Sequence, residues 1–333
     1  MQRRVLLKIM IIAIIVQLLC LSLISGAVNV SSKATKKGFL YNVKQENSVQ
    51  QINITFESSN YTLYGEIYYP SNESGTYPGI VFCEGMGGYI NAYNWIPKAL
   101  AEEGYISIIF DFPGQGKSEG IFPIRAINIP FLNIYFRYTI LIETPIHYKN
   151  GKWVTATSDA LTYLLEESLV KDMIDNTSIG LIGHSMGGIT VTETAAIDKR
   201  VDAVVALSQG NIQIVNKVDV PIQFQGGCFD MGTFSIPIVL RCYKKANTPK
   251  ELIAIQYGTH FGFSTAWGPL CPCPKWQKDI CLRYAVGWFD YFLKNKTDAY
   301  EIITTGVDHL SKFIKSRYNF GDGEYILETK QDG

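Results

Sequence analysis

The pentapeptide at 183–187, Gly-His-Ser-Met-Gly, has the clearest chemical meaning in this chain of 333 residues. A serine hydroxyl is a weak nucleophile at neutral pH, so chemistry at Ser185 requires a base beside it. The apolar run at 179–182 predicts a buried strand directly before the motif, and residues 187–196 predict a helix directly after it. Glycines flank such a tight turn because a Cβ there would collide with neighbouring backbone. We predict Ser185 as an exposed nucleophile, with a purely structural glycine turn as the alternative.

The base for this serine must come from a small set, because the chain contains only four histidines: His147, His184, His260 and His309. His260 follows the predicted strand at 252–256, and a loop after a late strand is where a base is delivered to such a turn. His184 adjoins the serine, but its side chain should point away from it and pack. We predict His260 as the general base, with His309 in the polar tail as the alternative.

A carboxylate is needed to fix the tautomer of the base and to stabilise the imidazolium that forms. Asp230 comes directly after the predicted strand at 221–225. The chain order Ser185, Asp230, His260 is the order expected when the nucleophile sits on a strand-to-helix turn. We predict Asp230 as the orienting acid; a solvated loop aspartate is the alternative.

Acyl transfer also needs two backbone donors for the oxyanion. The first helical residue after the turn carries an N–H without an intrahelical partner, which favours Met186. A second donor is expected from the glycine-rich loop at 84–88, which follows the predicted strand at 79–83. We predict the N–H of Met86 for it, with a simple glycine turn as the alternative for this loop.

The elements that must hold these residues alternate between strand and helix. Two β-rich runs, 51–56 and 61–69, predict a hairpin. Further strands are predicted at 79–83, 105–110, 179–182, 201–207, 221–225 and 252–256, and helices at 91–103, 158–167, 187–196 and 284–293. Near-continuous apolar strands alternating with helices indicate an α/β fold, with a mostly parallel central sheet and helices on both faces.

Five segments occur together in an order that resembles the α/β-hydrolase family, in particular its esterase and dienelactone-hydrolase-like branch: 79–88, 111–120, 183–188, 227–230 and 258–262. The resemblance covers about 67–293. It implies a serine hydrolase of the carboxylesterase or lipase-like kind, which cleaves a small-molecule or lipid-like ester, or a related acyl bond, through an acyl-serine. It implies no cofactor, and Cys271-Pro272-Cys273 lacks the spacing of a zinc site. Many relatives carry His-Gly where this chain has Glu84-Gly85.

Two other functions use the same features. A serine peptidase of the same fold would share the triad, and a non-catalytic surface protein could retain a hydrolase fold. Binding of nucleic acid is not expected, because 30 basic and 30 acidic residues cancel. Hydrophobic residues make up 47% of the chain, which is enough for a sizeable core.

The chain begins with a basic start, Arg3, Arg4 and Lys8, followed by an apolar run of about 20 residues. We predict residues 1–27 as a cleaved signal peptide or an uncleaved anchor, so the protein is secreted or membrane-anchored outside the cytoplasm. A polar linker at 28–50, a hydrolase domain at 51–300 and a C-terminal extension at 301–333 complete the predicted layout.

The segment at 120–153 interrupts the alternation of strands and helices, and it is rich in bulky apolar residues. Long loops in compact domains are usually functional, so it is predicted either as a lid-like insert or as an extra core-packing helix.

Cysteines and glycosylation motifs accompany the predicted export. Cys83 and Cys228 are predicted as buried thiols that do not pair. Cys242 is predicted to bond Cys271 or Cys273, with Cys281 taking the other. Six Asn-x-Ser/Thr motifs favour a glycoprotein: Asn29, Asn53, Asn60, Asn72, Asn176 and Asn295.

Overall fold

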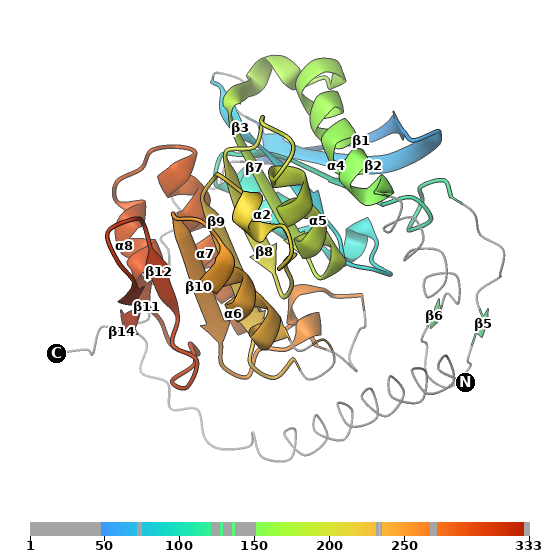
Figure 1. Cartoon of the computed structure of the whole chain (residues 1–333). Coiled ribbons are helices and arrows are strands. Elements are labelled where there is room, and N and C mark those ends of the chain that lie inside the picture. Colours follow the sequence, from blue (N-terminus) through green and yellow to red (C-terminus); the bar gives the residue numbers. More distant parts are fainter. Residues whose placement is uncertain are drawn as a thin grey trace.

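The computed structural model describes residues 48–71, 75–120, 127–128, 135–136, 151–230, 233, 235–266 and 272–329. Most strands of this part join one ten-stranded sheet, in the order β1-β2-β4-β3-β7-β8-β9-β10-β12-β13 (Figure 1). Their bounds are β1 Val49–Ser58, β2 Tyr61–Pro70, β3 Tyr77–Cys83, β4 Ile106–Phe110, β7 Ile174–His184, β8 Ala203–Leu207, β9 Ile222–Gly227, β10 Lys250–Ile255, β12 Arg317–Asn319 and β13 Tyr325–Ile326.

The centre of the sheet is parallel and its two edges are antiparallel. Strands β4, β3, β7, β8, β9 and β10 pair in parallel, while β1 and β2 form the predicted hairpin at one edge. At the other edge β12 pairs antiparallel with β10 and β13 with β12. All residues of β4 and β8 are buried, as expected for strands covered on both faces. The predicted fold class is therefore confirmed.

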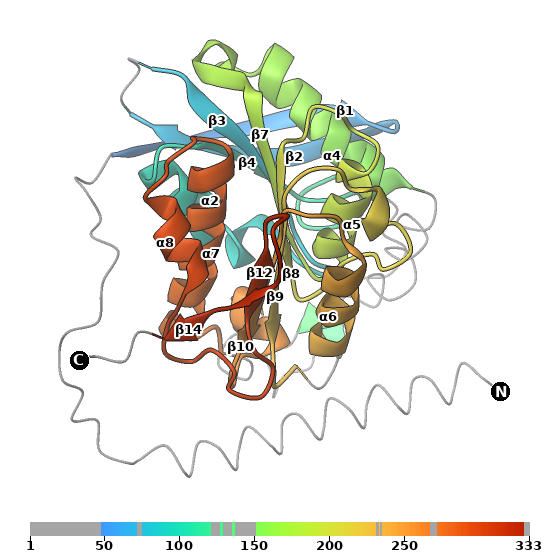
Figure 2. The same cartoon turned by 60° about the vertical axis from the view of Figure 1, so that its left-hand side comes forward.

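Two layers of helices enclose the sheet, one on each face (Figure 2). One layer consists of α4 (Lys152–Thr162), α5 (Met186–Ala195) and α6 (Ser235–Lys245), which pack into one hydrophobic cluster. The other consists of α2 (Trp95–Glu102), α7 (Lys275–Phe292) and α8 (Ala299–Thr304), which pack into a second cluster. The sheet thus contributes its two faces to two separate cores.

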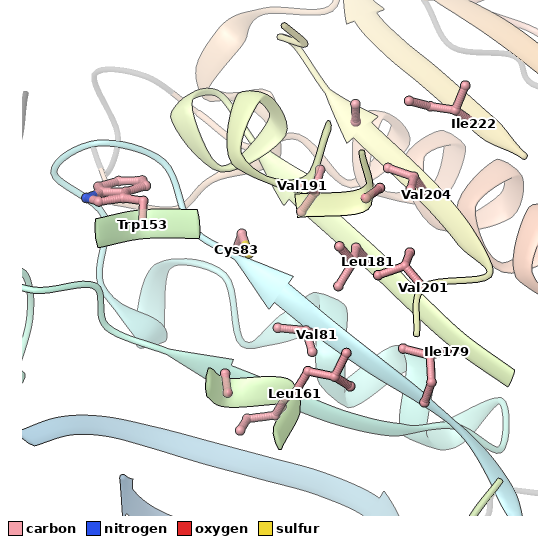
Figure 3. Packing of buried hydrophobic residues seen from close by; sticks show 14 of the residues in the cluster. Val81, Cys83, Trp153, Leu161, Ile179, Leu181, Val191, Val201, Val204 and Ile222 are labelled. Atoms are coloured by element: carbon pink, nitrogen blue, oxygen red, sulfur yellow. The ribbon is translucent and has the colours of Figure 1, made fainter. Parts of the chain in front are cut away.

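The register of the central strands aligns the side chains of the first core. Val81 of β3 pairs with Leu181 of β7, which pairs with Val204 of β8, and all three are fully buried (Figure 3). Burying a side chain of this size contributes about 1.5–3 kcal/mol, so this row helps to fix the register. Because parallel strands in fixed register end at one edge, the loops after β7, β9 and β10 are brought together.

Several predicted helices have different bounds in the structure. The predicted helix at 91–103 divides into a 3₁₀ turn, Ile90–Ala92, and α2, which ends before Gly104 at φ 82°. The predicted helix at 158–167 begins earlier, as α4, and its last turn is a π-helix, Tyr163–Glu167. Helix α6 was not predicted from the sequence.

The C-terminal part adds to the same sheet, because β12 pairs with β10. A short pair of strands, β11 (Thr305–Gly306) and β14 (Glu328–Thr329), lies in the same part of the chain. The N-terminal segment, 1–27, lies outside the described residues, and the predicted domain boundaries stay predictions. Within the described ranges, no helix is long and apolar enough to cross a membrane.

Most of the predicted insert at 120–153 lies outside the described residues. Within it, β5 (Ile127–Asn128) pairs antiparallel with β6 (Tyr135–Phe136), and α4 begins at its end. The choice between a lid and a core-packing helix stays open.

The predicted disulfides are wrong. Cys83, Cys228, Cys242, Cys273 and Cys281 are all free thiols. Cys242 is buried on α6 in the first core, whereas Cys273 lies just before α7 and donates its thiol to the carbonyl of Gly262 over 2.9 Å. Cys271 lies outside the described residues. Cys83 ends β3 and Cys228 directly follows β9; two strands separate β3 from β9, and both thiols are free. Cys83 is buried as predicted, while Cys228 is only partly buried.

Trp153 ties α4 to the loop after β4, since its ring stacks on Phe112 with centroids 3.9 Å apart and planes 6° apart. Both side chains are fully buried. Trp153→Ala should therefore lower the free energy of unfolding by about 3–5 kcal/mol, as large-to-small changes in cores do. Urea denaturation measures this. Trp153→Phe, which keeps an aromatic face for Phe112, should cost less than half as much. Equal stability of Trp153→Ala and the native protein would show that this stack contributes nothing.

Candidate active site

The turn between β7 and α5 holds Ser185 in an unusual backbone conformation, with φ 58° and ψ −118°. A non-glycine residue at positive φ costs about 1–3 kcal/mol and persists only where the surroundings impose it. The flanking glycines explain how the turn is tolerated. A Cβ on Gly187 would lie 2.1 Å from the carbonyl oxygen of Cys83, and one on Gly183 would lie 2.4 Å from that of Gly187. The steric reason for glycine at these positions is confirmed.

The predicted triad residues meet at the carboxyl edge of the sheet. His260 Nε2 lies 2.9 Å from Ser185 Oγ, and His260 Nδ1 lies 2.7 Å from Asp230 Oδ2. His260 and Asp230 are 6% and 5% exposed, whereas Ser185 is half-buried. Both distances are within the reach that proton transfer requires. An imidazole held in this way can take a proton from the serine while the carboxylate stabilises its charged form.

Asp230 accepts two hydrogen bonds from Thr233, which was not predicted as a site residue. Thr233 donates its N–H to Oδ1 over 3.0 Å and its hydroxyl to Oδ2 over 2.7 Å. Burial alone would raise the pKa of Asp230, but the contacts with His260 and Thr233 outweigh it and hold the pKa below its ordinary value. The acid is therefore a carboxylate. The signal in the sequence is a threonine three residues after an aspartate, a spacing typical of side-chain-to-backbone turns.

The other histidines lie outside this hydrogen-bonded set. His184 packs as predicted: its Nδ1 lies 2.9 Å from the hydroxyl of Tyr93, and its ring lies 4.6 Å from that of His260. Burial, and then the neighbouring His260, lower the pKa of His184 well below its usual range. His184 is therefore neutral and packs against the ring of His260. His309 is exposed and stacks on Trp276, and His147 lies outside the described residues.

The loop after β3 passes directly beside the nucleophile. A Cβ on Gly85 would lie 3.2 Å from the Cβ of Ser185. Gly88 donates its N–H to the carbonyl of Gly85 over 2.9 Å, with Gly87 at φ 75°, so 85–88 form a tight turn that carries Met86. Met186 is the first residue of α5. The two predicted oxyanion donors therefore flank the serine, and their role stays a prediction.

No group of His, Cys, Asp or Glu among the described residues could hold a metal ion.

The fold and the sequence together define the class of protein. A family model for the alpha/beta hydrolase fold matches residues 78–226, which include β3, β4, the serine turn and β9. This stretch carries most of the parallel centre of the sheet described above; β10 lies beyond it. The chain has the α/β-hydrolase fold and is similar to that family over this stretch, so the resemblance found from the sequence is confirmed.

Among curated proteins, the chain is similar to several ester hydrolases. It is 22% identical over 239 residues to the bis(hydroxyethyl) terephthalate hydrolase of Streptomyces coelicolor, covering 70% of this chain and 63% of that protein. It is 21% identical to Lipase 1 of Moraxella sp. (strain TA144), covering 78% and 69%. It is also 21% identical to Cutinase 2 of Thermobifida cellulosilytica, covering 73% and 78%. The chain thus spans less than two thirds of the first of these relatives.

The bonds from Thr233 to Asp230 give a test of this site. Thr233→Val removes the hydroxyl but keeps the backbone N–H, so it should lower kcat for p-nitrophenyl acetate by about tenfold, equivalent to about 1.4 kcal/mol. Thr233→Ser keeps the hydroxyl and should stay within about threefold of the native enzyme. Native kcat in the valine variant would show that the hydroxyl does not support the acid.

Proposed function

We propose that this protein is a serine hydrolase that cleaves carboxylic esters through an acyl-serine intermediate. The single observation that carries the proposal is His260, whose two ring nitrogens lie within hydrogen-bond distance of Ser185 and Asp230. In this arrangement the nucleophile, the base and the orienting acid are all in contact before a substrate binds.

The chemistry follows from this geometry. Ser185 Oγ attacks the ester carbonyl while its proton moves to His260 Nε2, and the carbonyl electron pair moves onto the oxygen. The N–H groups of Met86 and Met186 stabilise that oxyanion. When the pair returns, the C–O bond to the alcohol breaks and His260 donates the proton to the leaving oxygen. Water then repeats the cycle on the acyl-serine, which releases the carboxylic acid and restores Ser185.

The proposed substrate class is a small-molecule or lipid-like ester. The printed names of the relatives support it, because they include a terephthalate ester hydrolase, a lipase and a cutinase. These names support ester cleavage, and at 21–22% identity they do not select one acyl or alcohol group.

We also propose that the protein acts outside the cytoplasm, exported through residues 1–27 and either released or held at a membrane. The basic start and apolar run of that segment support this. Glycosylation belongs to the same proposal. Four of the six motif asparagines lie among the described residues, and all four are exposed: Asn53, Asn60, Asn176 and Asn295.

The test is loss of hydrolysis without loss of fold. Ser185→Ala should abolish turnover of p-nitrophenyl esters, and His260→Ala and Asp230→Asn should each lower kcat by about 10³-fold or more. The melting temperature should change little, because Ser185→Ala and Asp230→Asn nearly keep the side-chain volume and His260 lies outside both hydrophobic clusters. His309→Ala, on the exposed histidine, is the matched control and should keep native kcat. Hydrolysis of amides but not esters would favour the peptidase, and no hydrolysis by the native protein would favour the non-catalytic alternative.

A further inference from the structure

The loop beside the nucleophile begins with a carboxyl group that is fully buried. Glu84 directly follows β3 and is 0% exposed. Its Oε1 accepts the N–H of Phe112 over 3.2 Å and the side-chain amide of Gln115 over 2.6 Å. Burying a carboxyl group is costly unless it is neutral or hydrogen-bonded, so a buried glutamate at this position needs a reason.

Gln115 links the side chain of Glu84 to the backbone on both sides of Met86 through hydrogen bonds. Its Oε1 accepts the N–H of Gly87 over 2.5 Å, and its Nε2 lies 3.3 Å from the carbonyl oxygen of Gly85. The same amide therefore contacts the residue before Met86 and the residue after it. At 2% exposure Gln115 is shielded from water, which strengthens these bonds.

A second carboxyl group fixes the far end of the same loop. Asp111 Oδ1 accepts the N–H of Ile90 over 2.8 Å, and its Oδ2 accepts that of Lys117 over 2.7 Å. The segment 84–90 is thus bonded at its start, middle and end to the segment 111–117. The two segments form one unit, although the sequence separates them by the whole of α2 and β4.

On its other side the loop rests against the serine turn. A Cβ on Gly187 would lie 2.5 Å from the carbonyl oxygen of Glu84, so the backbone of residue 84 is in close contact with the first turn of α5. Glu84 therefore lies between the turn that presents Ser185 and the segment that holds Gln115.

The side chain of Glu84 favours its neutral form. Burial, and then the nearby Asp111, raise the pKa of Glu84 well above its ordinary value, and the bonds from Gln115 and Phe112 only partly oppose this. A neutral acid has the same shape and hydrogen-bonding capacity on this side as a glutamine amide. Glutamine is therefore the natural conservative replacement.

We propose that Glu84 is a positioning residue that acts through Gln115 to hold the Met86 N–H at the oxyanion site. This rests on the proposed function, because the oxyanion arises only if Ser185 attacks an acyl carbon. Donors aimed at developing charge act in the transition state and not in substrate binding. Loss of the hydrogen bonds that join Glu84 to Gln115 and Gln115 to Gly87 should therefore lower kcat and leave KM nearly unchanged.

The experiment compares kcat and KM for p-nitrophenyl butyrate in three variants. Glu84→Met and Gln115→Met keep volume but remove the bonds, and each should lower kcat about tenfold or more, since removal of an oxyanion donor costs about 10²–10³. KM should stay within about twofold of native. Glu84→Gln should keep kcat within about threefold, because it restores the bonds. Gln115→Met leaves the buried carboxyl group intact, so it remains informative if Glu84→Met does not fold.

Glu251 supplies the matched control. It is also 0% exposed, its Oε2 accepts the amide of Gln223 over 2.6 Å, and it lies at the start of β10, away from the carboxyl edge. Glu251→Met should lower the melting temperature about as much as Glu84→Met, while kcat stays within about twofold of native.

The outcomes separate this inference from the function on which it rests. Native kcat in both methionine variants would overturn the positioning role while ester hydrolysis by the native enzyme stands. An equal fall in kcat for Glu251→Met would show that the loss of activity comes from general destabilisation. That result would also overturn the positioning role. If the native protein hydrolyses no ester, the proposed function fails and the positioning role fails with it.

Discussion

The conformation of Ser185 is the constraint on which the site depends. Its positive φ turns the chain sharply from β7 into α5 and presents the hydroxyl at the carboxyl edge of the sheet. That turn is possible only because Gly183 and Gly187 allow backbone to approach where a Cβ would clash. The surrounding structure must impose this strain, and β7 is held between its parallel neighbours β3 and β8. The stability of the sheet therefore maintains the backbone conformation of Ser185.

The sheet also explains how residues far apart in sequence meet. Asp230 and His260 lie 45 and 75 residues after Ser185 respectively, yet each follows a parallel strand that ends at the same edge. The loop after β3 reaches the same edge and places the turn at 85–88 beside the serine. Thr233 on one side and the Glu84–Gln115 pair on the other then fix the orientation of the acid and of the predicted oxyanion loop. Hydrogen bonds from neighbouring side chains thus hold Asp230 and the loop after β3 in place.

The sequence was sufficient for the features that depend on local pattern and chain order. Apolar strands, the glycines around Ser185, and the order of serine, acid and base all follow from short motifs. Glu84 stood out in the sequence, but its partner Gln115 was missed because the two side chains meet across 31 positions, with α2 and β4 between them. Thr233 lies only three residues after Asp230 and was missed although its spacing is a local signal. The disulfides were wrong for a different reason. The position of Cys242 depends on α6, an amphipathic helix that was not predicted and that buries this cysteine in the first core, whereas the Cys273 thiol lies against the carbonyl of Gly262.

The central claim is that Ser185 is an activated nucleophile, and covalent labelling tests it most directly. The native protein is treated with a fluorophosphonate, digested, and the modified peptide is sequenced by mass spectrometry. The account predicts one adduct per chain, on Ser185, with much slower labelling in His260→Ala because the base is lost. An adduct on another residue, or labelling as fast without His260 as with it, would contradict the account.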